Sequence, residues 1–164
     1  MSLTALEKLK YYKNPELAEG ILKTELAKRK LTVYGARATN VQLPNYLNKK
    51  TEDYDVLANK PKKTALDILR RLNKEYGGEY FRLEHAEHKG TFKIKSNVTG
   101  GTIADITQAK RFPKSKEHLG INYRALPSIK KTLKRVLRSG KAEFRKDKDL
   151  ELLQRIELSE ESNW

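Results

Sequence analysis

The sequence predicts an α+β domain, with a mixed β-sheet, flanking helices and a C-terminal helical segment. Two observations lead to this fold class. Short strand-like segments alternate with segments of helical periodicity as far as residue 107, whereas only helical periodicity follows from about residue 126. The length of 164 residues fits one domain. We expect its core over about residues 14–108 and its C-terminal helices over about 126–158.

The first elements follow from start and stop signals. Asn14-Pro15-Glu16 is typical of a helix start, and apolar residues at helical spacing predict a helix over 14–30. The apolar run 31–34 predicts a strand, and residues 36–41 a short helix. Residues 53–57 alternate between polar and apolar side chains, which predicts a half-buried strand.

The middle of the chain predicts a long helix and three strands. Proline at the first position and an apolar stripe predict a helix over 61–76, which the glycine pair 77–78 ends. Residues 79–87 and 91–95 flank a turn and predict a hairpin, and 102–107 predicts another strand.

Two amphipathic helices are predicted after these strands, over residues 128–138 and 142–158. No strand is predicted between residue 107 and the first of them. The predicted order is therefore helix, strand, short helix, strand, helix, hairpin, strand and two helices.

The composition restricts the possible functions. Lys and Arg number 35 against 21 Asp and Glu, and the net charge of +14 favours a polyanionic partner. The absence of cysteine excludes disulfide scaffolds, thiolate metal sites and cysteine nucleophiles. No apolar run approaches the roughly 20 residues of a membrane span. We expect a cytoplasmic protein without a membrane partner.

Three carboxylates are the candidates for chemistry. Asp53 and Asp55 are two residues apart on a predicted strand, so their side chains share a face about 7 Å apart. Asp105 lies between apolar neighbours on a later strand. If the two strands are adjacent, the three carboxylates meet and suit Mg²⁺ or Mn²⁺. The alternative is an exposed strand face without a ligand.

Gly35 marks a strand-to-helix turn upstream of the carboxylates. A glycine at such a turn lets the backbone approach a phosphate group, and the helix that follows offers free N–H groups. An ordinary turn is the alternative interpretation.

Together these segments resemble the DNA polymerase β-like nucleotidyltransferase superfamily. The resemblance is carried by residues 34–40, by Thr51-x-Asp53-Tyr54-Asp55-Val56 and by Ile103-Ala104-Asp105-Ile106, within close to half of the chain. Within the superfamily, the chain looks like the compact members related to the poxvirus poly(A) polymerase catalytic subunit. We therefore expect a viral or archaeal source, and the host cytoplasm if the source is viral.

The resemblance implies an enzyme that transfers NMP from an NTP to a hydroxyl acceptor. Asp53 and Asp55 would hold two Mg²⁺ or Mn²⁺ ions, while Asp105 would bind the catalytic ion and help to deprotonate the hydroxyl. The N–H groups of Gly35 and Ala36 would contact the triphosphate, with Arg37 as a charge donor.

The sequence departs from the superfamily pattern at two points near this turn. Gly35-Ala36 stands where Gly-Gly or Gly-Ser is usual, so one hydroxyl is missing. The gap from Gly35 to Asp53 is also longer than usual and contains Pro44.

Basic residues favour a nucleic-acid end as the acceptor. One predicted helix carries five of them largely opposite its apolar stripe: Lys130, Lys131, Lys134, Arg135 and Arg138. A solvated helix face is the alternative. Lysines bracket the strand with the paired aspartates, either to steer a triphosphate or simply as loop lysines: Lys49, Lys50, Lys60, Lys62 and Lys63.

Other functions stay open at this point. A two-metal nuclease would use the same three aspartates, with Asp105 and Lys110 as an acid-and-lysine pair. A non-catalytic basic module that binds nucleic acid is the other alternative. The chain lacks room for large accessory domains, which points to a protein partner, a homo-oligomer or a small acceptor.

Overall fold

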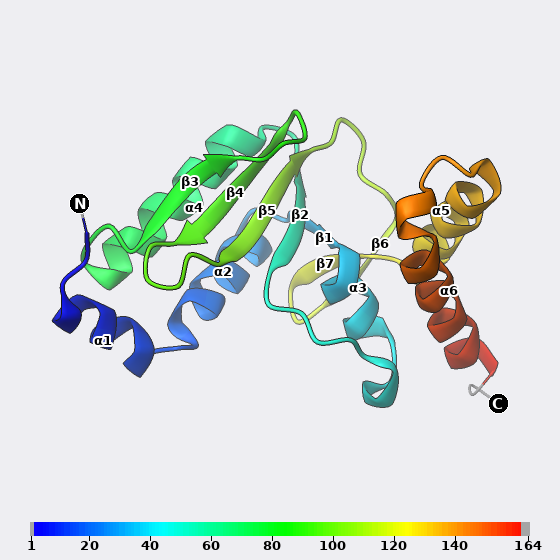
Figure 1. Cartoon of the computed structure of the whole chain (residues 1–164), viewed down its shortest axis with the longest axis horizontal. Helices are drawn as coiled ribbons and strands as arrows, with labels where there is room; N and C mark the ends of the chain where they lie inside the picture. The colour runs from blue at the N-terminus through cyan, green and yellow to red at the C-terminus, as the bar shows by residue number, and fades with distance from the viewer. Residues whose placement is uncertain (1, 162–164) are drawn as a thin grey trace.

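The computed structural model describes residues 2–161 as one seven-stranded sheet with six α-helices and two short 3-10 helices (Figure 1). The helices are α1 (Ala5–Lys13), α2 (Leu17–Lys28), α3 (Gly35–Gln42), η1 (Asn45–Leu47), α4 (Pro61–Tyr76), α5 (Leu126–Ser139), η2 (Glu143–Arg145) and α6 (Lys146–Glu161). The strands are β1 (Thr32–Tyr34), β2 (Tyr54–Ala58), β3 (Phe81–His85), β4 (Thr91–Ser96), β5 (Thr102–Gln108), β6 (Ser115–His118) and β7 (Ile121–Arg124).

The sheet is mixed, with strand order β3-β4-β5-β2-β1-β7-β6. The pairs β2–β5 and β1–β7 are parallel, and the remaining four pairs are antiparallel. The predicted fold class is therefore confirmed, as are the hairpin and the helix that precedes it.

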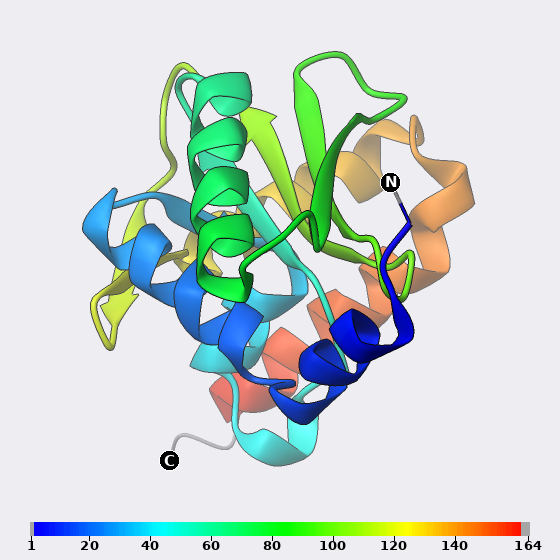
Figure 2. The same cartoon turned by 90° about the vertical axis from the view of Figure 1, so that its left-hand side faces the viewer.

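One face of the sheet packs against α2 and α4, which lie side by side in Figure 2. The alternation of β2 and β5 directs Val56 and Ile106 into this core, and both are fully buried. The alternate side chains of these strands, including Asp55 and Asp105, occupy the opposite face. That opposite face positions the candidate site.

The N-terminal part differs from the prediction. A capping box between Thr4 and Glu7 starts an additional helix, α1, and its Tyr11 stacks on the buried Tyr76. Asn14 belongs to the end of α1, where its side-chain amide donates to the carbonyl oxygen of Lys10. Helix α2 consequently begins at Leu17, not at Pro15.

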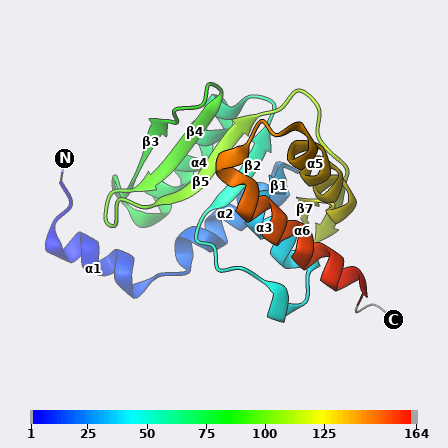
Figure 3. The same ribbon diagram turned by 45° about the vertical axis from the view of Figure 1, so that its right-hand side comes forward.

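The sheet extends beyond the last predicted strand. β7 pairs in parallel with β1, and β6 adds an edge strand whose residues are all exposed. Helices α5 and α6 pack on each other next to this part of the chain (Figures 1 and 3). Arg155 of α6 donates to the carbonyl oxygen of Leu47 at 2.9 Å, which ties the C-terminal segment to η1. No helix within residues 2–161 is long and apolar enough to cross a bilayer.

Candidate active site

The three candidate carboxylates meet at the centre of the sheet. β2 and β5 are parallel neighbours, and Asp55 is paired in register with Asp105. Asp53 directly precedes β2. One carboxylate oxygen from each of the three residues lies within 4.8 Å of the other two. The structure thus brings together the residues that the sequence singles out.

This crowding perturbs the acids. Burial, together with repulsion from Asp53 and Asp105, raises the pKa of Asp55 to about 6. Burial also raises the pKa of Asp105, against the opposing charge of Lys93. The buried Oδ1 of Asp105 accepts no hydrogen bond from residues 2–161, and the Nζ of Lys93 lies 3.7 Å from it. The cluster therefore holds more negative charge than its protein neighbours compensate.

A divalent cation would relieve both the unpaired oxygen of Asp105 and the repulsion among the carboxylates. Carboxylate oxygens are the donors that hard Mg²⁺ and Mn²⁺ ions prefer, and an ion among them would satisfy the unpaired oxygen of Asp105. It would also offset the repulsion that raises the pKa of Asp55. The residues present thus fit a divalent metal.

Gly35 lies against this cluster and has to be glycine. Its φ of +70° disfavours any side chain, and a Cβ at this position would come within 2.3 Å of the Oδ2 of Asp55. Tyr34 and Asp55 are cross-strand partners, so the β1–α3 turn reaches the carboxylates directly. The amides of Gly35 and Ala36 open helix α3 beside the acids.

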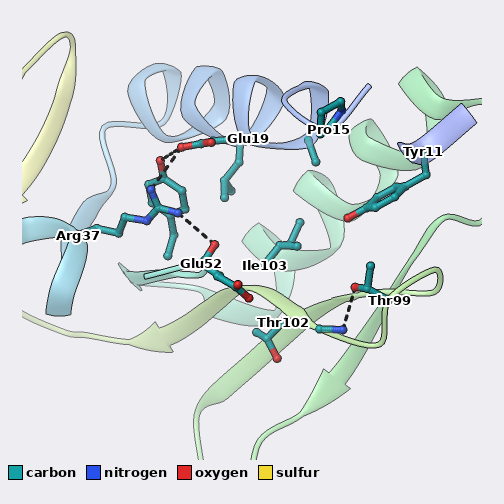
Figure 4. A pocket seen from close by; sticks show the side chains of 12 residues that line it. Tyr11, Pro15, Glu19, Arg37, Glu52, Thr99, Thr102 and Ile103 are labelled. Atoms are coloured by element: carbon teal, nitrogen blue, oxygen red, sulfur yellow. Dashed lines mark hydrogen bonds and ion pairs between the residues drawn. The ribbon is translucent and has the colours of Figure 1, made fainter. Parts of the chain in front are cut away.

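The guanidinium of Arg37 forms hydrogen bonds with other residues of the protein. Its guanidinium donates to the carbonyl oxygens of Glu52 and Asp53, at 3.1 and 3.2 Å, and to the carboxylate of Glu19 at 3.3 Å. Figure 4 shows the contacts with Glu19 and Glu52 at the wall of a pocket of about 300 Å³. The guanidinium also stacks 4.1 Å above the ring of Tyr54. Arg37 thus holds the segment that presents Asp53, and its contact with a triphosphate stays a prediction.

Two cations near the carboxylates were missed by the sequence analysis. Lys93 is the cross-strand partner of Asp105, whereas the sequence analysis paired this acid with Lys110. Arg145 precedes α6 and interacts electrostatically with Asp55. Neither signal is local: the first depends on the register of β4 and β5, and the second on how α6 packs.

The basic residues of α5 lie largely at the surface. Lys131, Lys134, Arg135 and Arg138 are exposed, while Lys130 forms an ion pair of 2.7 Å with Glu160 of α6. Their contact with nucleic acid stays a prediction.

Comparison with known proteins agrees with the geometry. No protein-family model and no curated protein matches the sequence. Among solved structures, the chain is similar to the crystal structure of the Megavirus polyadenylate synthase, with a TM-score of 0.75 and 21% sequence identity. The match covers 91% of this chain but 32% of the synthase chain, so it spans about a third of that protein. This similarity shows that the chain shares the fold of that part of the synthase, in agreement with the resemblance stated from the sequence.

Proposed function

We propose that the protein is a metal-dependent nucleotidyltransferase that transfers NMP from an NTP to a hydroxyl acceptor, namely a nucleic-acid end. The observation that carries the proposal is the meeting of Asp53, Asp55 and Asp105 within 4.8 Å on one sheet face. The close approach of Gly35 to Asp55 supports it, because it puts free backbone N–H groups beside the acids. The fold shared with a viral polyadenylate synthase gives further support.

The three aspartates would hold two Mg²⁺ or Mn²⁺ ions. When bound, the ions supply positive charge that stabilises the entering and leaving oxygens of an in-line displacement. The amides at the start of α3 would bind the triphosphate and orient its α-phosphorus. Asp105, whose pKa is raised, would assist in removing the proton of the attacking hydroxyl. The new bond joins the acceptor oxygen to the α-phosphorus, and pyrophosphate leaves.

The acceptor is proposed from charge. A net charge of +14 and the exposed cations of α5 favour a polyanion over a neutral acceptor. The related synthase is named for polyadenylate, so ATP is the first nucleotide to examine.

Thermal unfolding tests the proposal. The protein is unfolded with Mg²⁺ or Mn²⁺ plus each of the four NTPs, with metal alone, and with EDTA. A ligand at about 100 times its dissociation constant adds roughly 2.7 kcal/mol to stability, or about 5–11 °C for a chain of this size. We expect a metal-dependent shift with at least one NTP, absent from the Asp53→Asn, Asp55→Asn variant.

The other outcomes separate the alternatives. A shift with metal but none with any NTP would favour the two-metal nuclease. No shift with either ligand would favour the non-catalytic module that binds nucleic acid.

A further inference from the structure

A groove of about 670 Å³ lies where helix α4 begins and where β4 and β5 reach the same end of the sheet. Its floor is apolar and includes Pro61, Leu66 and Phe92. We call it the α4 groove. It lies on the α4 side of the sheet, where Phe92 packs, whereas the carboxylates occupy the other face.

Cations surround this apolar floor. Five of them line the α4 groove: Lys60, Lys62, Lys63, Arg70 and Lys89. The single acidic residue in the lining, Asp67, is already shared by ion pairs with Lys63, Arg70 and Arg29. The exposed side chains of Lys60, Lys62 and Lys89 have no ion-pair or hydrogen-bond partner within residues 2–161. The groove therefore carries uncompensated positive charge over an apolar surface.

We propose that the α4 groove binds single-stranded RNA. Three separate lysines without partners match a chain of phosphates better than one phosphate group, because they come from both the start of α4 and the turn before β4. The apolar floor matches unpaired bases, which a single strand exposes and a duplex hides. An acidic peptide without apolar side chains would satisfy the lysines but would leave the floor without a partner.

The position of the groove connects it to the proposed reaction, and this step rests on the proposed function. Gln108 borders the groove and lies three residues after Asp105 on β5, which is about 10 Å along the strand. An acceptor strand with its 3′ hydroxyl at Asp105 would pass around the end of β5, where Lys110 is exposed. The groove would then hold nucleotides upstream of the 3′ end rather than the terminal one.

The test measures RNA binding without metal or NTP, so that it is independent of catalysis. The affinity of a fluorescent 12-nucleotide single-stranded RNA is measured over a range of salt concentrations. The groove variant is Lys60→Gln, Lys62→Gln, Lys89→Gln. Its control variant removes the same charge from exposed lysines of α1 and α2: Lys8→Gln, Lys13→Gln, Lys28→Gln. A third variant carries Lys131→Gln, Lys134→Gln, Arg138→Gln on α5. Melting curves show whether each variant folds.

Each lost phosphate contact lowers the slope of log K against log salt concentration by about 0.7 for a single strand. Three lost contacts lower it by about 2, so we expect the groove variant to bind RNA roughly 100-fold more weakly at 0.1 M salt. The control variant should stay within about threefold of the wild type. An equal loss in the control, or a loss confined to the α5 variant, overturns the proposal. Tighter binding of DNA of the same sequence overturns the choice of RNA. If ATP displaces the fluorescent RNA at a concentration that saturates a site for one mononucleotide, the groove binds a mononucleotide and the proposal of a nucleic-acid strand is overturned.

The groove and the proposed activity can fail separately. If the wild-type protein transfers nucleotides and the folded groove variant still binds RNA as tightly as the wild type, the proposal of RNA binding in the groove is refuted and the proposed function is not. A wild-type protein that binds RNA through the groove but transfers no nucleotide with any NTP refutes the proposed function alone. The Asp53→Asn, Asp55→Asn variant should retain RNA binding, since it leaves the groove unchanged.

Discussion

Replacing Asp55 with asparagine should stabilise the metal-free protein while it removes metal binding. Burial and the charges of Asp53 and Asp105 raise the pKa of Asp55 from 3.8 to about 6. The folded protein therefore binds this proton more tightly than the unfolded chain, and the folded state loses stability as pH rises from about 4 to about 6. Above pH 6 the cost is constant at roughly 3 kcal/mol. Asparagine carries no charge and avoids this cost.

The assay is thermal unfolding in EDTA at pH 8 and at pH 5. The Asp55→Asn variant should melt higher than the wild type at pH 8, by about 6–12 °C for roughly 3 kcal/mol in a chain of this size. At pH 5 the gain should be about half as large, because Asp55 is then mostly protonated in the folded state. The Asp147→Asn variant, at an exposed acid of α6, serves as the control and should change little at either pH. A lower melting temperature for Asp55→Asn at pH 8 would refute this reasoning.

Three further substitutions probe the surroundings of the carboxylates. Gly35→Ala should weaken Mn²⁺ binding at least about tenfold, because the new Cβ would displace Asp55. The matched control is Gly100→Ala, where nothing lies within 4 Å of the new Cβ. This control should only lower the stability of the fold, by the roughly 1–2 kcal/mol that a left-handed backbone costs a side chain. Arg37→Gln should weaken Mn²⁺ binding by about 10-fold, because the segment that presents Asp53 loses the hydrogen bond from Arg37. If calorimetry shows that this variant loses NTP affinity alone, the result would instead support a contact between Arg37 and the triphosphate. Lys93→Met should move the pH midpoint of Mn²⁺ binding upward by less than about 0.7 unit, and a downward shift would contradict the ion pair with Asp105.

The carboxylate cluster could be predicted because its signals are local. Two aspartates at alternate positions of a strand share a face whatever the strand pairs with. Asp105 stands out because its neighbours are apolar. The adjacency of β2 and β5 is a tertiary property, and the shared pattern of the superfamily supplied it as an expectation that the structure then met.

The missed elements have weak or misleading local patterns. Leu6, Leu9 and Tyr12 of α1 are 79%, 47% and 60% exposed, so they form no buried stripe. The sequence of β6, Ser115–His118, contains no apolar residue, and this edge strand is held by its pairing with β7. Asn14 shows a different limit: the same residue type suits a helix start and the end of the preceding helix. Only the position of α1 decides between them.

The roles of Lys93 and Arg37 depended on contacts between distant residues. Lys93 faces Asp105 because the register of β4 and β5 aligns them, and no spacing in the sequence reveals that register. Arg37 follows the glycine turn in sequence, which suggested a phosphate contact. In the structure its side chain is directed to Glu19 and to the carbonyl oxygens before β2.

Transfer of a labelled nucleotide tests the central claim most directly. The protein is incubated with Mn²⁺, an α-³²P-labelled NTP and a single-stranded RNA with a free 3′ hydroxyl, and each of the four NTPs is used in turn. The account predicts that the wild-type protein extends the RNA with at least one of them. It also predicts that EDTA and the folded Asp53→Asn, Asp55→Asn variant abolish the extension. Extension by this double variant, or extension in EDTA, would contradict the assignment of the three carboxylates.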